Sequence, residues 1–295
     1  MNERASAEEL GEYYMPFVAK AEYSGHFDAN GIPMLDYRGV LGLQYNPIAI
    51  AQYGLGNYNL FRRLHDPDRR RKFLRIAEWM VDKLEPNRAG FKVWHHHFDW
   101  EYRTTLQAPW YSGLAQGQGI SLLVRAFVET GDSVYLEAAK AAFEPMLHDV
   151  SEGGVAFTDP QGHLWLEEYV VHPAPPTHIL NGFIWATWGV YDYWLTTRDD
   201  AAQALFASCM KTIAANLPRF DAGFWSLYEQ SGTRMRMLAS PFYHHLHIVQ
   251  LRVLHGLTGD PVFLHFAERW AKYRRSWLKS RSALVHKSVF KLCYY

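Results

Sequence analysis

The sequence predicts a mainly α-helical protein whose helical hairpins curl into an incomplete α/α toroid, with short β-hairpin inserts at one rim. The first observation is a recurrence of aspartates at the start of helical segments, about 60–70 residues apart. They are Asp68, Asp132, Asp199 and Asp260. The second is that each follows one helical run and precedes another, which is the pattern of stacked hairpins. The hydrophobic content of 48% in 295 residues is enough for a large core.

Residues 1–46 are the least regular part of the sequence. Turn signals at 24–25, 28–31 and 37–39 interrupt short apolar pieces, which predicts irregular structure with two short strands. From Pro47 the apolar spacing becomes helical and continues to Leu64, with proline suited to the first turn.

The helices that follow form the four expected hairpins. Aspartate before a helix accepts hydrogen bonds from free backbone N–H groups, so each capping aspartate separates two helices. The first helices of the pairs are expected at 47–64, 113–129, 178–196 and 244–257. The first of the second helices is expected at 69–84, and the second helices carry the charged outer face. We therefore expect three parts: an N-terminal segment (1–46), a toroid (47–280) and a C-terminal tail (281–295).

Three longer inserts separate the hairpins, at 86–109, 151–176 and 219–241, and contain aromatic, strand-like pieces. Each insert follows the second helix of one pair and precedes the first helix of the next. We therefore expect all three at the same rim of the toroid. A cleft ringed by them is the expected site.

Composition excludes some classes of function. Lys+Arg and Asp+Glu both number 30, and this zero net charge argues against bulk nucleic-acid binding. An anionic sugar remains compatible, since a pocket needs only one or two local cations. Aromatic residues make up 16% of the chain, which suits both sugar stacking and an ordinary aromatic core.

Targeting and redox features are few. Cys209 and Cys293 are too few for a disulfide framework or zinc site, and we expect both to be inert buried thiols. The sequence begins without a signal-peptide pattern, and no stretch approaches the ~18 apolar residues of a membrane span. We therefore expect a cytoplasmic protein, unless the chain is a trimmed piece of a longer one.

The stretch 165–193 is the first candidate for chemistry. It contains Glu167 and Glu168, followed by Tyr169, a proline-rich loop and an apolar run rich in Trp and Tyr. Neighbouring side chains of a strand point to opposite faces, so only one of the two glutamates can face a cavity. The alternative is a capping acid beside a buried helix.

The third insert contains the second group of candidates. Tyr228 and Tyr243 flank Arg234 and Arg236. A tyrosine is a poor base at neutral pH unless a nearby cation lowers its pKa, and two arginines would supply that field. Ordinary aromatic packing is the alternative for both tyrosines.

Histidines and glycines give weaker indications. His244 and His247 have the spacing of metal ligands on a helix, but no acidic or cysteine partner stands at a matching distance, so we predict no metal. In the run 95–97, alternation along a strand allows at most two histidines to share a wall of the cleft. Gln116 and Gly119 lie three residues apart on an inner helix. The small residues there allow close approach either of a ligand or of a neighbouring helix.

Four stretches resemble the D-glucuronyl C5-epimerase family, which converts glucuronate to iduronate in heparin-type polysaccharides. They are YNPIAIAQYGL (45–55), WYSGLAQGQGISLLVRAF (110–127), WLEEYVVHPAPPTHILNGF (165–183), and YHHLHIVQL with TGDPVFLHFAERW (within 243–270). The resemblance covers most of residues 45–276 and implies the helical toroid of that family. The animal enzymes have a β-rich region ahead of it, which this chain is too short to hold in full.

The resemblance implies roles for particular residues. The family's catalytic carboxylate matches Glu168, and its catalytic tyrosines match Tyr228 and Tyr243. Residues expected to bind substrate are Tyr169, Asn181 of the LNGF motif, Arg103, Arg234, Arg236, His244, Trp185 and Gln116. One departure concerns the arginine that closely follows the first tyrosine in the family, in a YDLRH-like run. Here the run is YEQS, so Arg234 or Arg236 would take over the substrate carboxylate.

The expected reaction removes the C5 proton of a uronate from one face and returns a proton to the other. It needs two acid/base groups across the ring and donors for the enolate, and no redox cofactor. We place Glu168 on one face and Tyr243 on the other, with Tyr228 assisting. The partner is an acidic polysaccharide, and the animal enzymes suggest a homodimer.

Two other functions remain open. A uronate polysaccharide lyase begins with the same C5 proton abstraction and then expels the C4 substituent. A catalytically inert toroid that binds acidic glycans is the other, and the displaced arginine is its best support.

Overall fold

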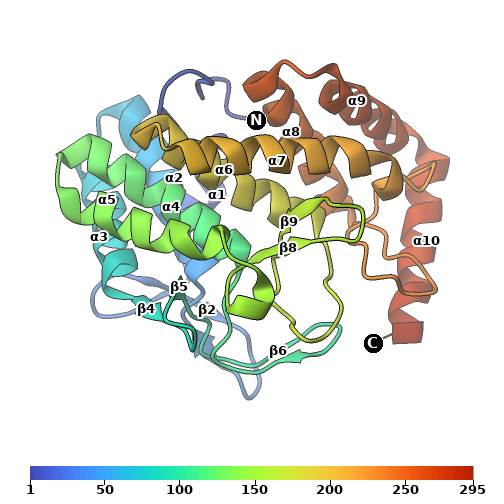
Figure 1. The fold of residues 1–295 in the computed structure, drawn as a ribbon, viewed down its shortest axis with the longest axis horizontal. Helices are drawn as coiled ribbons and strands as arrows, with labels where there is room; N and C mark the ends of the chain where they lie inside the picture. The colour runs from blue at the N-terminus through green and yellow to red at the C-terminus, as the bar shows by residue number, and fades with distance from the viewer. Residues whose placement is uncertain (295) are drawn as a thin grey trace.

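The computed structural model describes residues 1–294, apart from the side chain of Lys291, and is mainly helical (Figure 1). Antiparallel helical hairpins make up its body, as predicted. The pairs are α2 (Pro47–Leu64) with α3 (Pro67–Asp82), α4 (Gly113–Thr130) with α5 (Ser133–Phe143), α6 (Leu180–Thr197) with α7 (Asp200–Asn216), and α8 (Pro241–Thr258) with α9 (Pro261–Arg275).

The first helix of each pair lies inside the ring and the second outside. All residues of α4 from Gly113 to Ala126 are buried, because α4 packs between α2 and α6. The contact with α6 depends on glycine: a Cβ at Gly117 would lie 2.5 Å from the Cα of Ala186. The outer helix α5 buries only an intermittent stripe, as expected for a helix with one face toward water.

Aspartate caps start the outer helices. Asp132, Asp199 and Asp260 each accept a backbone N–H of the following first turn, as predicted. The prediction for Asp68 was wrong, because Asp66 is the cap of α3 and accepts from the N–H of Asp68. The sequence offers both aspartates around Pro67, and the helix begins at the proline, which needs no hydrogen-bond acceptor there.

The N-terminal segment and the inserts contain short strands. Three strands precede α2, rather than two: β1 (His26–Phe27), β2 (Pro33–Asp36) and β3 (Leu43–Gln44), with α1 (Val18–Ala21) before them. The first insert forms the hairpins β4 (Leu84–Pro86) with β5 (Lys92–Trp94) and β6 (Trp100–Glu101) with β7 (Thr105–Leu106). The second forms β8 (Ala156–Thr158) with β9 (Leu164–Leu166), and short 3-10 turns lie at Glu144–Met146, Val150–Glu152 and Leu217–Phe220.

The third insert differs from the expected hairpin. It contains no strand within the described residues and is held by isolated bridges, Asp221 to Ser226 and Leu227 to Leu238. The N–H of Tyr228 donates to the carbonyl of Met237 within this pairing, whereas the carbonyl of Tyr228 accepts the N–H of Leu180 at the start of α6.

The beginning of the N-terminal segment closes the ring at the end opposite the inserts, whereas β2 lies beside the first insert (Figure 1), where Tyr37 packs against Phe98. Arg125 of α4 and Asp192 of α6 form a fully buried ion pair of 2.6 Å, to which the Tyr14 hydroxyl donates at 2.7 Å. Asn59 of α2 binds the backbone of Tyr13. These bonds place residues 13 and 14 across the ends of the inner helices.

A further helix, α10 (Trp277–Tyr294), continues from α9 and includes most of the residues expected as a tail. It packs beside the third insert, where the N–H of Met235 donates to the Tyr294 hydroxyl at 3.2 Å. Of the two thiols, Cys209 is buried as predicted, whereas Cys293 is exposed on α10, so the prediction for it was wrong. Among residues 1–294, no helix combines the length and apolarity needed to cross a membrane.

Candidate active site

The adjacent glutamates lie just after β9, outside the strand, and their carboxyl groups contact different neighbours. The Glu167 carboxylate accepts the backbone N–H groups of Thr177 (3.2 Å) and His178 (3.1 Å), and it lies 2.5 Å from Nδ1 of His178. Glu167 therefore holds the far end of the proline-rich loop against the strand. Glu168 turns the other way, against the first turn of α6.

Glu168 occupies space that exists because residue 182 is glycine. A Cβ on Gly182 would overlap the Oε2 atom of Glu168 and lie 2.7 Å from its Cβ. Asn181 donates to the same Oε2 at 3.4 Å, while its own Oδ1 has no partner within residues 1–294. Glu168 is only 5% exposed, and this burial, with Glu167 adding to it and Tyr169 opposing it, raises the pKa of Glu168 to about 8.

A cluster of tyrosines surrounds Glu168. The ring centroids of Tyr102 and Tyr169 are 4.7 Å apart, and those of Tyr228 and Tyr243 are 4.9 Å apart. These residues come from all three inserts and from the first turn of α8. The inserts thus meet at one rim, as predicted, and the structure brings the predicted residues Glu168, Tyr169, Tyr228 and Tyr243 together.

The tyrosines are held in their neutral form. Burial raises the pKa of Tyr228 well above 10, and the charge of Glu168 adds to the effect. The pKa of Tyr243 is raised for the same two reasons. At neutral pH both hydroxyls therefore keep their protons, and the group of this cluster that titrates nearest to neutrality is Glu168.

A buried ion pair lies next to the tyrosines. Glu229, 3% exposed, follows Tyr228 and pairs with the guanidinium of Arg103 from the first insert. The hydroxyls of Tyr102 and Ser231 each donate to the same carboxylate at 2.5 Å. Arg103 lines a cavity of about 310 Å³ together with Tyr102 and Ser231. Sequence reasoning singled out Arg103 but missed Glu229, which stands directly beside a predicted tyrosine.

Arg234 and Arg236 lie elsewhere. Both line a separate cavity against α10, bordered by His286, Cys293 and Tyr294. None of these residues belongs to the tyrosine cluster. The prediction that one of the two arginines stands beside the catalytic residues therefore needs correction, because the third insert turns that part of its backbone toward α10.

Three predicted substrate-binding residues lie in the core. Gln116 is buried, and its side chain accepts from the N–H of Trp94 and donates to two backbone carbonyls. His244 is buried between the Ser226 hydroxyl (2.8 Å) and the carbonyl of Trp270 (3.1 Å). Trp185 packs inside the ring near Phe17. We correct all three assignments, because these side chains serve helix packing rather than the rim.

Two histidines of α8 contact the same hydroxyl group. His244 and His247 both turn Nδ1 toward the Ser226 hydroxyl, at 2.8 and 3.0 Å. Within residues 1–294, no group of three or more His, Cys, Asp or Glu side chains is arranged to hold a metal ion.

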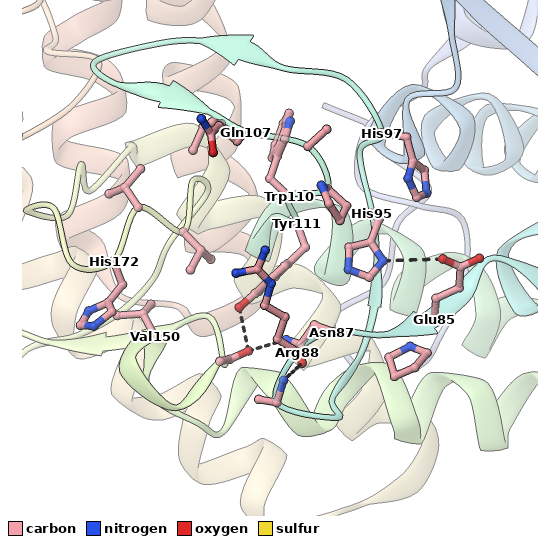
Figure 2. A pocket seen from close by; sticks show the side chains of 18 of the residues that line it. Glu85, Asn87, Arg88, His95, His97, Gln107, Trp110, Tyr111, Val150 and His172 are labelled. Carbon is pink, nitrogen blue, oxygen red and sulfur yellow. Dashed lines mark hydrogen bonds and ion pairs between the residues drawn. The ribbon is translucent and has the colours of Figure 1, made fainter.

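A cleft of about 830 Å³ opens beside the tyrosine cluster (Figure 2). Its walls are the turn between β4 and β5, the segments 104–111 and 150–153, and residues 170–172. His95 and His97 share one wall, whereas His96 is buried behind it and stacked on Trp110 at 3.8 Å, as the alternation predicts. Trp110 separates the cleft from the cluster, with its ring 5.7 Å from that of Tyr169.

A comparison with protein-family models shows which family the chain belongs to. The family model described as "D-glucuronyl C5-epimerase C-terminus" matches residues 89–272, which include the tyrosine cluster, Glu168 and Arg103. The chain belongs to this family. The resemblance seen in the sequence is therefore confirmed.

The chain matches relatives of different lengths. The D-glucuronyl C5-epimerase of Caenorhabditis elegans is 30% identical over 216 residues, which cover 68% of this chain but only 34% of that protein. The chain thus spans about a third of the length of that relative. An uncharacterized protein of Methanocaldococcus jannaschii is 27% identical over 246 residues, and the alignment covers 78% of each of the two chains.

Solved structures extend the likeness to the fold. Cellobiose 2-epimerase from Spirochaeta thermophila superposes with a TM-score of 0.57 at 13% identity, over 78% of this chain and 58% of that one. At this identity the likeness concerns the fold alone. It agrees with the α/α toroid of this chain.

Proposed function

We propose that the chain is a C5-epimerase that converts D-glucuronate to L-iduronate in a heparosan-type polysaccharide. Family membership supports the reaction class. The observation that carries the proposal is Glu168, a buried carboxyl with a pKa of about 8 that faces a cluster of protonated tyrosines. Proton exchange at carbon requires a base and an acid held within reach of the reacting carbon.

Glu168 is the proposed base. With a pKa of about 8, about one molecule in ten carries the carboxylate at pH 7. The tyrosines have pKa values above 10 and offer essentially no tyrosinate at that pH. The C5–H bond breaks toward Glu168, its electron pair moves into the substrate carboxylate, and an enolate forms.

Tyr243 is the proposed acid. Its hydroxyl donates a proton to C5 from the opposite face, which inverts the carbon. Tyr228 lies against Tyr243 and donates a hydrogen bond to the enolate oxygen, where preorganised donors lower the barrier most. Solvent then takes the proton from Glu168 and returns one to Tyr243, so the product carries a solvent hydrogen at C5.

Arg103 is the proposed partner of the substrate carboxylate. It comes from the first insert and takes the role that the family's YDLRH-like run assigns to an arginine after Tyr228. Glu229 orients its guanidinium beside the tyrosines. A planar guanidinium recognises a carboxylate through paired N–H groups, and a fixed orientation reduces the entropy lost on binding.

The test follows C5 by NMR during incubation with a heparosan-type polymer in deuterated water. We expect deuterium at C5 together with iduronate signals. Glu168→Gln and Tyr243→Phe should each lower the exchange rate by about 10²–10⁴-fold, the usual contribution of a general acid or base. Tyr135→Phe, on the outer helix α5, is the matched control and should exchange at the wild-type rate.

Two results would contradict the proposal. Unsaturated chain ends that absorb in the near ultraviolet would identify a lyase, since the same enolate would then expel the C4 substituent. Binding of the polymer without any C5 exchange in the wild-type protein would identify an inert glycan-binding toroid.

A further inference from the structure

We propose that Ser226, which is held between His244 and His247 of α8, is a positioning residue for the two tyrosines of the reaction. This inference rests on the proposed function, since it concerns how Tyr228 and Tyr243 are placed relative to each other. Ser226 lies two residues before Tyr228, and His244 directly follows Tyr243. A bond between Ser226 and His244 therefore joins the two backbone segments that carry the tyrosines. Ser226 is fully buried and acts through the tyrosines rather than on the substrate.

The Ser226 side chain is enclosed by two imidazoles. Its Oγ lies 2.8 Å from Nδ1 of His244 and 3.0 Å from Nδ1 of His247. The backbone N–H of Ser226 also donates to Nδ1 of His244, at 3.2 Å. All three residues have 0% exposure, and hydrogen bonds in such a low-dielectric interior are strong and costly to break. The contacts therefore fix residue 226 against α8.

The protons of these hydrogen bonds have one consistent direction. Nε2 of His244 lies 3.1 Å from the carbonyl of Trp270, so it carries the proton and Nδ1 is the acceptor. The Ser226 hydroxyl has a single proton, which it donates to His244, and its Oγ accepts one from Nδ1 of His247. A proton on Nε2 of His247 instead would leave two lone pairs facing each other across 3.0 Å. That Nε2 atom has no partner within residues 1–294, as a bare acceptor nitrogen requires.

Burial keeps both imidazoles neutral. It lowers the pKa of His244 to about 4 and that of His247 well below 6.5. A neutral imidazole has one donor and one acceptor nitrogen, and the assigned proton directions need both kinds. At neutral pH the chain of hydrogen bonds from His247 through Ser226 and His244 to Trp270 is therefore complete.

The backbone carries the effect of this chain to the tyrosine pair. The Trp225 ring stacks on that of His244 at 3.7 Å, so Ser226 and its neighbour are both seated on α8. Two residues further on, the Tyr228 ring lies 4.9 Å from that of Tyr243. Reacting side chains keep a productive geometry only when the residues behind them are themselves fixed by packing and hydrogen bonds. Loss of the Ser226 hydroxyl should therefore let Tyr228 shift relative to Tyr243.

The first test needs no substrate. Long-range proton–nitrogen NMR spectra of the full chain, labelled in histidine, report which ring nitrogen of each imidazole is protonated. We expect the proton of His244 on Nε2 and that of His247 on Nδ1. In Ser226→Ala the His247 signal should move toward a mixture of both forms, because its Nδ1–H loses its acceptor. A proton on Nε2 of His247 in the wild type would overturn the inference.

The second test is C5 exchange at several substrate concentrations. Ser226→Ala should lower kcat about 10–100-fold, as for a catalytic group displaced by up to about 1 Å, and leave KM at the wild-type value. The proposed partner of the substrate carboxylate is Arg103, whose ion pair the substitution does not touch. The nuclear Overhauser contact between the rings of Tyr228 and Tyr243 should weaken in parallel. Ser226→Cys keeps a weak donor at the same position and should give an intermediate rate.

The matched control is Ser121→Ala in α4. Ser121 is also fully buried, but its hydroxyl has no partner within residues 1–294. Its removal should leave kcat, KM and the contact between the tyrosine rings unchanged. Urea unfolding of each variant gives the folded fraction, to which the exchange rates are referred.

The outcomes keep this inference apart from the proposed function. A wild-type protein without C5 exchange contradicts the epimerase, whereas the protonation of His247 and the contact between the tyrosine rings still support or overturn the role of Ser226. A folded Ser226→Ala protein with wild-type kcat, or with an unchanged ring contact, overturns the inference. An equal fall of kcat in Ser226→Ala and Ser121→Ala does the same.

Discussion

The Glu168 carboxyl group rests against the bare Cα of Gly182, at the start of α6. A Cβ at residue 182 would overlap Oε2 and lie 2.7 Å from both Cβ and Cδ of Glu168. Glycine at this position leaves the side-chain volume that the glutamate occupies. The glycine of the LNGF motif therefore makes room for the Glu168 side chain because it has no Cβ.

Gly182→Ala should reduce C5 exchange about 100-fold, because a shift of about 1 Å in a catalytic group has an effect of that size. Overpacking at this contact should also cost about 1–3 kcal/mol of unfolding free energy. Exchange is measured by NMR and stability by urea unfolding of the same preparation.

The matched control is Gly256→Ala in α8, where an added Cβ meets nothing within 4 Å. That substitution should stabilise the protein by about 0.5–1 kcal/mol through helix propensity and leave exchange unchanged. Equal exchange rates in the two variants would remove the role assigned to Gly182.

Glu168→Gln should change how stability depends on pH. The folded-state pKa of Glu168, about 8, lies above the ordinary value of 4.5, because burial favours the neutral acid. Its contribution is complete below pH 4.5 and is lost as pH rises through 8, with a ceiling of about 5 kcal/mol. Urea unfolding near pH 5 and pH 9 should show the variant gaining stability relative to wild type at the higher pH. The same difference in unfolding free energy at both pH values would contradict a raised pKa for Glu168.

The rate of C5 exchange should rise with pH. Glu168 must lose its proton to act as base, so kcat/KM should increase about tenfold per pH unit below pH 8 and then level off. The measurement is loss of C5 deuterium from labelled substrate in ordinary water between roughly pH 6 and 9.5. A rate that falls over this range would assign Glu168 as the acid instead.

Arg103→Leu should impair both stability and substrate binding. It leaves Glu229 buried without its guanidinium, which costs about 3–5 kcal/mol. Adding Glu229→Gln to Arg103→Leu should recover most of that stability, yet KM for the uronate polymer should stay raised. These effects are measured by urea unfolding and by C5 exchange at several substrate concentrations.

Arg236→Leu serves as the control for Arg103. It removes an arginine that lines the cavity against α10, so KM should match that of the wild type. A wild-type KM in the double variant, or a raised KM in Arg236→Leu, would return the carboxylate-binding role to the third insert.

Arg125→Met should destabilise the ring without altering the chemistry. It leaves Asp192, which has 0% exposure, without its ion-pair partner, at a cost of about 3–5 kcal/mol. Arg125 lies twelve residues after Gly113 along α4, or about 18 Å from the insert end. The folded fraction should therefore exchange C5 at the wild-type rate, and a reduced rate under conditions where urea curves show full folding would contradict this separation.

Much of the helical framework could be read from local patterns. Helical periodicity and the caps Asp132, Asp199 and Asp260 each involve residues within a few positions of one another. Where two local signals competed, as Asp66 and Asp68 do around Pro67, the sequence left the choice open.

The roles of individual aromatic and polar residues were harder to assign. His244 and Gln116 stand in motifs of the family, yet both use their side-chain atoms inside the core. A polar residue on an inner helix can face the rim or a neighbouring helix, and its neighbours in sequence do not distinguish the two. Burial of a polar group with full hydrogen bonding is a property of the packed ring.

The sequence by itself determined the helical hairpins, the order of the inserts and the family, because these depend on residue types at short spacing. Only the tertiary structure decided that Arg103 pairs with Glu229, a residue 126 positions away, and that Glu168 lies on Gly182. It also decided that Arg234 and Arg236 face α10. Such contacts depend on how the three inserts fold over one another, and no local pattern of charge or hydrophobicity specifies that.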